Sequence, residues 1–237
     1  MRARLLLITC SLALLSPLAR GADDPLPARI VAFARTVGPD DYAYTRTIRT
    51  EEVAQDKSEP HVVIERFDPA KPGDQRWTFV SVDGRAPTAK EMRDYRDSLS
   101  KRRPAYYGRV AEYFTNAANK NVDAQGRAHF HFAAMPKGTV MVGDSDLSAH
   151  IAGDVLVDTT SGDAPFLSEV HFNSTTPTRV KLIAKIDRFD TTTRYRLLPD
   201  GKPVPSEFES EMSGSLLGKS GTIRTRITFS DYRRVGK

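Results

Sequence analysis

Residues 67–107 read FDPAKPGDQRWTFVSVDGRAPTAKEMRDYRDSLSKRRPAYY, and this stretch decides how the chain is organised. It begins at the end of one predicted strand and continues with turns rich in proline, glycine and aspartate. A second strand is predicted over residues 76–82. A helix begins at Thr88, because Thr88 and Glu91 have the spacing at which two residues cap each other reciprocally. Pro104 ends that helix. Helix therefore enters, at this point, a chain whose other segments are patterned mostly as strands.

The inserted helix is strongly charged and has one narrow apolar stripe. Met92, Tyr95 and Leu99 recur at intervals of three and four residues, which places them on one helix face. A further turn or two of helix follows, so the helical insert covers about residues 88–115. The basic run 101–103 is either a solvated helix end or a contact for the anionic headgroups of an envelope membrane surface.

Alternation of apolar and polar residues predicts strands before and after the insert. Residues 42–52 and 62–67, together with 76–82, indicate an antiparallel meander, and a short amphipathic helix over residues 25–36 precedes it. Strand patterns resume after the insert at hairpin spacing, over residues 128–132, 150–158, 166–173, 179–189, 192–198, 207–217 and 222–233. No strand–helix–strand repeat occurs, so the predicted fold class is mainly β (α+β), with a strongly curved antiparallel sheet.

Two details indicate how the sheet bends and how it ends. Gly153 and Gly214 interrupt strand patterns, as expected for bends or bulges in a curved sheet. Glu209 and Glu211 alternate on one side of a late strand, and arginines alternate in the same way over residues 222–228. If these two strands pair, the opposite charges face each other, and each pair contributes about 0.2–1 kcal/mol.

The first residues predict a secretory signal peptide over residues 1–21. Basic residues precede an apolar run that is shorter than a bilayer span, and small residues allow cleavage near Gly21. Cys10, the only cysteine, lies in that run, where lipidation is an alternative to removal with the signal. The mature chain, residues 22–237, is then cysteine-free and long enough for a single domain. Such a chain fits a bacterial periplasm better than a disulfide-stapled extracellular scaffold.

The charge of the predicted mature chain is nearly balanced. The sequence has 35 basic and 30 acidic side chains. Arg2, Arg4 and Arg20 leave with the predicted signal peptide, and removing these three from 35 leaves 32 basic residues, a net charge of about +2. So balanced a chain does not indicate nucleic-acid binding.

No catalytic signature stands out. The sequence contains no nucleophile elbow, phosphate loop or dinucleotide fingerprint, so we expect neither an enzyme nor a cofactor. His129 and His131 share one face of a predicted strand and offer two ligands to a zinc-like ion, with a third from His150 or His171. The competing interpretation is two polar residues on the wet side of a strand whose other side carries phenylalanines.

Three features together resemble the bacterial lipoprotein-localisation factors, the LolA/LolB-like group. The first is the order of an N-terminal helix, a few strands, a helical insert and a long antiparallel run. The second is the ending, in which residues 198–205 (LPDGKPVP), a glutamate-rich strand and residues 221–233 (GTIRTRITFSDYR) look like the closing hairpin of that group's outer-membrane lipoprotein-sorting relatives. The third is residues 77–84, which look like their strand followed by a turn with glycine.

The resemblance implies an incomplete, strongly curved antiparallel barrel whose helices act as a lid. The cavity between sheet and lid would receive lipoprotein acyl chains. The lid side facing the cavity would carry Met92, Tyr95 and Leu99. The inner surface would be lined by Trp77, Phe79, Phe130, Phe132, Val155, Phe172, Leu182, Ile186, Phe208, Met212 and Ile227.

Three functions stay open at this point. The resemblance favours a non-enzymatic periplasmic carrier that binds lipid or lipoprotein acyl chains. The second is a cell-envelope scaffold or interaction protein whose half-barrel is filled by its own side chains. The third is a metal protein or enzyme built around His129 and His131.

Overall fold

The structure of the protein is a computed structural model, which describes residues 25–54, 57–115, 118–142, 145–180 and 184–236. The predicted signal peptide and Cys10 therefore lie outside the described residues. Among the described segments, no helix is long and apolar enough to cross a membrane.

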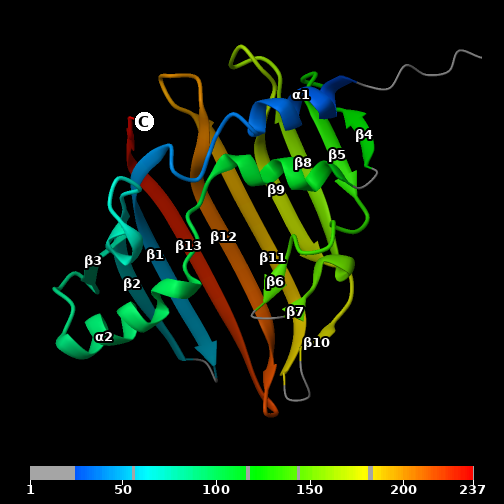
Figure 1. Ribbon diagram of the computed structural model, residues 1–237. Helices are drawn as coiled ribbons and strands as arrows, with labels where there is room; N and C mark the ends of the chain where they lie inside the picture. The colour runs from blue at the N-terminus through cyan, green and yellow to red at the C-terminus, as the bar shows by residue number, and fades with distance from the viewer. Residues whose placement is uncertain (1–24, 55–56, 116–117, 143–144, 181–183, 237) are drawn as a thin grey trace, which may run out of the picture.

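One large antiparallel sheet makes up most of the molecule (Figure 1). Its order is β3-β2-β1-β13-β12-β11-β9-β8-β5-β4, with β10 paired to β11. The strands are β1 (Tyr42–Ala54), β2 (Lys57–Phe67), β3 (Trp77–Val82), β4 (Asn119–Val122), β5 (Ala128–Phe132), β8 (Ile151–Asp158), β9 (Phe166–Ser174), β10 (Thr178–Val180), β11 (Ala184–Leu197), β12 (Pro203–Leu216) and β13 (Lys219–Arg234). A separate small sheet joins β6 (Met141–Val142) to β7 (Ser145–Asp146).

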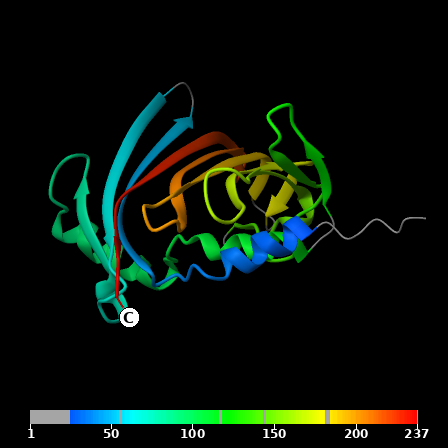
Figure 2. The same cartoon turned by 90° about the horizontal axis from the view of Figure 1, so that it is seen from above.

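The sheet is curved and is not closed into a barrel, so the fold class predicted from the sequence is confirmed. The helical segments are α1 (Pro25–Ala34), α2 (Ala89–Ser98) and the 3₁₀ helices η1 (Gly73–Arg76), η2 (Leu99–Lys101), η3 (Tyr107–Thr115) and η4 (Ser148–His150). Seen from above, the sheet forms a trough, and α1 and η3 lie along its concave side (Figure 2). The α2 helix lies apart from them, beside β2 and β3 (Figure 1).

The helix start predicted from Thr88 and Glu91 is confirmed. The Glu91 amide donates to Thr88 Oγ1 at 3.3 Å, and the Thr88 amide donates to Glu91 Oε2 at 2.7 Å. Arg85 adds an ion pair to Glu91 at 2.7 Å. The Arg85 guanidinium, together with the Thr88 cap, holds the pKa of Glu91 well below its usual range.

The main core lies between the concave side of the sheet and the pair formed by α1 and η3. Ile30 from α1 and Val110 from η3 are fully buried against strand residues such as Phe132 and Leu167. Tyr107 begins η3 and is also fully buried, and its hydroxyl oxygen accepts a hydrogen bond from the Leu167 amide at 2.7 Å. Burial raises the pKa of Tyr107. This side of the trough is therefore filled by side chains.

The convex face carries the charge pairs that the sequence predicts. Glu209 lies opposite Arg226 and Glu211 opposite Arg224 in the β12–β13 ladder, which confirms the predicted pairing. Arg224 Nε lies 2.9 Å from Glu211 Oε2, and Arg194 from β11 reaches Glu209 Oε2 at 2.9 Å. These pairs mark the outer side of the sheet as its solvated side.

Two predictions about the strands need correction. Residues 179–189 and 192–198 do not form two separate strands, because β11 continues through them from Ala184 to Leu197. Residues near Asp190 pair with β9 on one side and β12 on the other, so no turn forms there. The sequence analysis also missed β4, β6 and β7, which are two to four residues long and have no readable period.

Candidate ligand-binding site

Alternate residues of the central strands point into the trough. The register places Ile48 of β1 opposite Ile227 of β13, and Ile227 opposite Phe208 of β12. Further along the same face, Met212 lies opposite Ile223. Neither α1 nor η3 covers this part of the sheet in Figure 1. An apolar floor therefore runs along the centre of the trough.

The floor leads into a groove of about 370 Å³ near the turn between β12 and β13. This volume is within the range of about 300–1,000 Å³ that is usual for small-molecule sites. Glu52 and Lys219 contribute charged groups to it. The apolar residues that line it include Val142, Val180, Ala184, Ile186, Met212 and Ile223, which come from five strands. We refer to these eight residues as the concave groove.

Gly214 allows two strands to approach closely beside the concave groove. A Cβ atom at Gly214 would lie 2.1 Å from the backbone oxygen of Lys185, so no side chain fits there. The ladder between β11 and β12 shifts register next to this point, between Ile186 and Arg188. The bulge predicted at Gly214 is therefore confirmed.

Gly153 has a different role from the one predicted. The ladders of β8 with β5 and β9 show no register shift at Gly153. A Cβ atom there would lie 2.5 Å from Met135 Sδ and 3.2 Å from a ring carbon of Phe172. Glycine is needed at this position because side chains from the core occupy the space above it.

Three predicted cavity residues lie in the filled part of the trough. Phe130, Phe132 and Val155 are at most 3% exposed. The ring of Phe114, from η3, contacts Phe130 at 5.2 Å and Phe132 at 5.5 Å between centroids, both edge to face. Phe172 is half-buried beside them. These residues belong to the core under η3 and do not line the concave groove.

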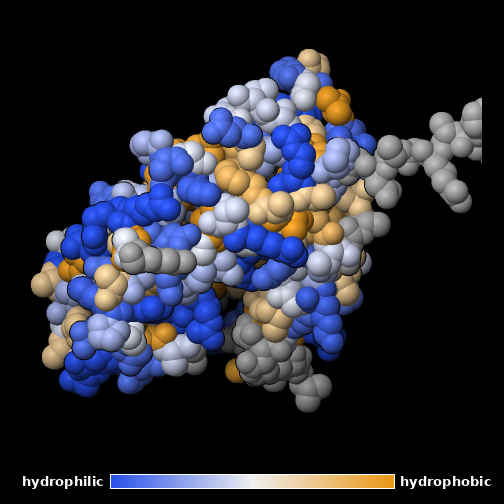
Figure 3. Space-filling model, turned by 45° about the horizontal axis from the view of Figure 1, so that its top comes forward, coloured by the Kyte–Doolittle hydropathy of each residue, from blue (hydrophilic) through white to orange (hydrophobic). Residues whose placement is uncertain are grey.

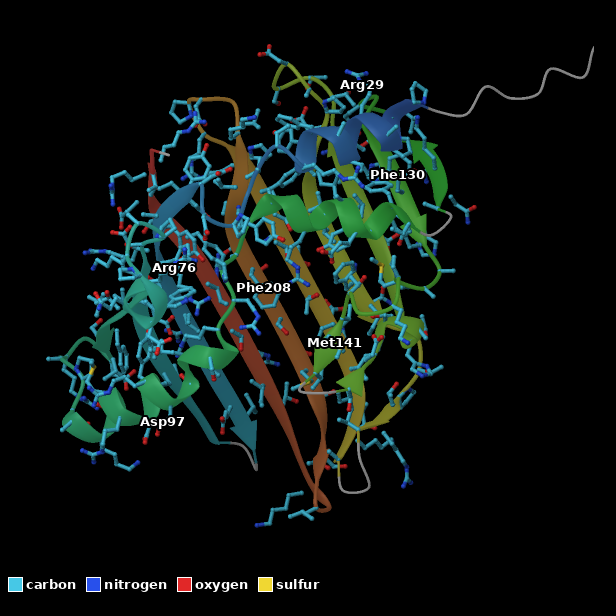
Figure 4. The ribbon with its side chains drawn as sticks, viewed as in Figure 1. Arg29, Arg76, Asp97, Phe130, Met141 and Phe208 are labelled. Carbon is cyan, nitrogen blue, oxygen red and sulfur yellow. The ribbon has the colours of Figure 1, made fainter. Side chains whose placement is uncertain are left out.

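The other sheet residues are divided between the groove and the open floor. Ile186 and Met212 line the concave groove. Phe208 and Ile227 are half-buried and pack against the smaller core cluster around Tyr44. Figure 4 shows Phe208 on β12 in the middle of the sheet, well separated from Phe130 beneath the helices. Leu182 lies outside the described residues.

The residues predicted for the lid lie against β3 and do not line the concave groove. Trp77, Phe79, Met92, Tyr95 and Leu99 line one cleft of about 530 Å³ between α2 and the edge of the sheet. Within it, the rings of Phe79 and Tyr95 stack at 4.7 Å between centroids. The structure therefore divides the predicted site residues among the filled core, the concave groove with its floor, and this cleft under α2. Figure 3 shows a hollow between the hydrophilic lobe that contains α2 and the rest of the molecule.

A buried ionic cluster holds α2 in place. Glu65 of β2 is 1% exposed, and its carboxylate accepts from Arg46 Nη2 at 2.8 Å and from Arg102 Nη1 at 2.5 Å. Each guanidinium also lies over an aromatic ring at 4.3 Å, Arg46 over Trp77 and Arg102 over Tyr95. Burial raises the pKa of Tyr95 to about 12. Arg102, the first of the two arginines in the basic run 101–103, therefore points inward, which corrects the expectation of a fully solvated helix end.

His129 and His131 pair with carboxylates on the outer side of the sheet. His129 and His131 lie on the exposed side of β5, as the competing interpretation expected. His129 Nε2 lies 3.0 Å from Asp123, and His131 Nδ1 lies 2.7 Å from Asp154. In the part of the chain that the structure describes, no group of three or more histidine, cysteine or carboxylate residues could hold a metal ion.

Six residues of the concave groove were not predicted from the sequence: the charged residues Glu52 and Lys219, and four apolar ones. Ile223 had a readable signal, because it alternates with Ile227 on β13. Val142, Val180 and Ala184 lie on very short strands or at a strand end, where no period can be read. The ladder β10–β11–β12 brings Val180 and Ala184 together, and Val142 joins them from the separate β6–β7 sheet.

Comparison with known proteins finds a likeness among solved structures alone. No family model matches it, and no curated protein matches it. Among solved structures it is similar to the crystal structure of a LolA superfamily protein from Nitrosomonas europaea, with a TM-score of 0.32 and 12% identity. The match covers 90% of this chain and 94% of that chain. At that TM-score and identity the likeness does not bear on the site, which is defined by the geometry of this chain.

Proposed function

We propose that the protein is a non-enzymatic carrier that binds an acyl chain of a lipid or lipoprotein in the concave groove. The observation that supports this is the groove itself, an apolar recess of about 370 Å³ at one end of an apolar floor. Each methylene group that leaves water contributes about 0.8 kcal/mol, so six buried methylenes contribute roughly 5 kcal/mol before ordering costs. An acyl chain in the groove therefore covers apolar side chains that are otherwise in contact with water.

The charged groups of the groove give the bound molecule an orientation. Lys219 and Glu52 are exposed, and both line the groove together with the apolar residues. Burying a charge without a partner is unfavourable, so the polar head of an amphiphile is placed beside these side chains and its tail along Ile186 and Met212. We propose further that the carrier acts in the periplasm, after removal of the predicted signal peptide.

A second function is favoured by a different observation. The trough under η3 is filled, since Phe130 and Phe132 are packed beneath Phe114. A scaffold or interaction protein of the cell envelope needs only such a filled half-barrel. The two functions differ in whether the concave groove takes up a ligand.

The test is uptake of a fluorescent long-chain fatty acid, together with native mass spectrometry and lipid extraction of the purified protein. Ala184→Trp fills the concave groove, and Met212→Glu places a carboxylate in it. We expect each to weaken uptake about tenfold or more, since either change removes apolar contact worth about 1.4 kcal/mol or more. Glu211→Gln is the matched control, because Glu211 lies on the same strand but faces Arg224 on the convex side.

Co-purified lipid, and uptake that only the two groove variants reduce, would support the carrier. Absence of both lipid and uptake in the unchanged protein would leave the scaffold as the function. Equal loss of uptake in Glu211→Gln would show that the fatty acid binds outside the groove.

A further inference from the structure

The turn between β12 and β13 has an apolar residue where turn chemistry favours a polar one. Leu216 pairs with Lys219, and the two residues between them have positive φ angles, 51° at Leu217 and 80° at Gly218. Such two-residue turns strongly prefer Asn-Gly, Asp-Gly or Gly-Gly, because side chains other than those of Asn and Asp rarely adopt the left-handed conformation. Leu217 is nevertheless 72% exposed. The tip of this turn, Leu217 and Gly218, therefore combines local backbone strain with an exposed apolar side chain.

Other apolar side chains are exposed near the same end of the trough. Ile223 of β13 is 39% exposed, and it lines the concave groove four residues from Lys219. Met141 of β6 is 49% exposed and adjoins Val142, which lines the groove from the other side. Figure 4 shows Met141 in the lower half of the molecule, where the β12–β13 turn also lies. The tip and the groove thus open toward the same end.

Cations surround this end. Lys219 directly follows the tip and is exposed. Arg179 of β10 lies opposite Lys185 of β11 in the ladder, so two cations are neighbours on the adjoining strands. Asp187 pairs with Lys185 at 2.5 Å, whereas Arg179 and Lys219 form no ion pair with any residue that the structure describes. Glu52 is the acidic residue that lines the concave groove together with Lys219. An apolar tip flanked by lysine and arginine matches the boundary between acyl chains and headgroups of a bilayer.

We propose that this end of the trough docks on an anionic phospholipid bilayer, with Leu217 inserted among the lipids. Docking requires only the tip and the flanking cations. The purpose of docking rests on the proposed function. Docking brings the concave groove to the membrane surface that releases or receives an acyl chain.

The experiment measures binding to vesicles by flotation, using the chain from Ala22 to Lys237, which contains every described element. Vesicles of phosphatidylglycerol and phosphatidylethanolamine are compared with vesicles of phosphatidylcholine. Leu217→Asn is the informative variant, because asparagine suits the left-handed position and removes only the apolar side chain. Val122→Asn is the control, since Val122 is 59% exposed on β4, at the opposite end of the molecule in Figure 1.

We expect binding to the anionic vesicles that weakens as salt is raised, with weaker binding to phosphatidylcholine. Leu217→Asn should weaken vesicle binding about tenfold, the effect of losing one buried leucine side chain. Its melting temperature should stay the same or rise, while Val122→Asn should bind as the unchanged protein does. Fatty-acid uptake without vesicles should also be unchanged in Leu217→Asn, because Leu217 does not line the groove.

Two results would overturn the docking proposal: no vesicle binding by the unchanged protein, or equal binding by Leu217→Asn. Loss of binding in Val122→Asn to the same extent would also overturn it, because the tip would then have no special role. Vesicle binding without any fatty-acid uptake would leave docking in place and remove the carrier function instead.

Discussion

The Glu65 carboxylate accepts a hydrogen bond from Arg102 at 2.5 Å, from Nη1 to Oε1, and so ties the segment after α2 to strand β2. Arg46 of β1 holds the other carboxylate oxygen at 2.8 Å. Because Glu65 is 1% exposed, its charge depends on these two partners in place of water. The position of α2 over the edge of the sheet therefore depends on one carboxylate.

Glu65→Gln should lower the free energy of unfolding by about 3 kcal/mol, because it leaves two partly buried guanidiniums without their counter-charge. Urea denaturation measures this change. Glu211→Gln, which removes one exposed pair on the convex face, should change the same quantity by about 0–1 kcal/mol. Equal losses in the two variants would show that the cluster around Glu65 is no stronger than a surface pair.

Removal of the hydroxyl group should affect protein stability differently at two tyrosines. Tyr107→Phe should destabilise the protein by about 1–3 kcal/mol, because the Leu167 amide then loses the hydroxyl that accepts its hydrogen bond. The Tyr95 hydroxyl is buried and has no hydrogen-bond partner among the residues that the structure describes. Tyr95→Phe should therefore be neutral or stabilising. Thermal unfolding measures the stability of both variants. A greater loss of stability in Tyr95→Phe than in Tyr107→Phe would contradict this prediction.

Alkaline pH should loosen the packing of α2. Burial raises the pKa of Tyr95 to about 12, above the value of about 10 for an unfolded tyrosine. The folded state thus favours the neutral phenol, and the associated stability is complete below pH 10 and is lost as the pH rises from 10 toward 12. Unfolding by urea at pH 8 and pH 11 measures the loss. Tyr95→Phe should lose less stability between these two pH values. An identical loss would show that ionisation of Tyr95 does not cause it.

Substitution of Gly214 should disturb both stability and the concave groove. The Cβ of Gly214→Ala would meet the Lys185 carbonyl oxygen at 2.1 Å, so β11 and β12 must separate locally. We expect a loss of about 1–3 kcal/mol and weaker fatty-acid uptake. At Gly221 the nearest atom to a new Cβ is Val53 O at 3.6 Å, so Gly221→Ala should be tolerated. Calorimetry compares the stability of the two variants, and the uptake assay measures Gly214→Ala against the unchanged protein.

Local signals in the sequence predicted much of the fold. The capping box at Thr88 and Glu91 identified the start of α2, because the interaction spans only three residues. The alternating charges that include Glu211 and Arg224 identified the last ladder, because strand period and turn position together fix the register of a hairpin. Elements of this kind carry their own pattern and need no distant partner.

The candidate site was less predictable, because it depends on which strands become neighbours. Periodicity places Phe130 and Phe208 on inward faces equally well. Only the structure shows that Phe114 covers the former and that the latter lies on the open floor. The inward turn of Arg102 was likewise invisible, since a charged residue at a helix end is usually solvated and its partner Glu65 lies on another strand.

The pairing of β1 with β13 joins the two ends of the fold, from Tyr42 opposite Arg234 to Val53 opposite Thr222. Among the described strands, β13 is the one that joins β1 to the rest of the large sheet. The meander β1–β2–β3 must therefore wait for β13 before it can join that sheet. Contacts between such distant segments slow folding.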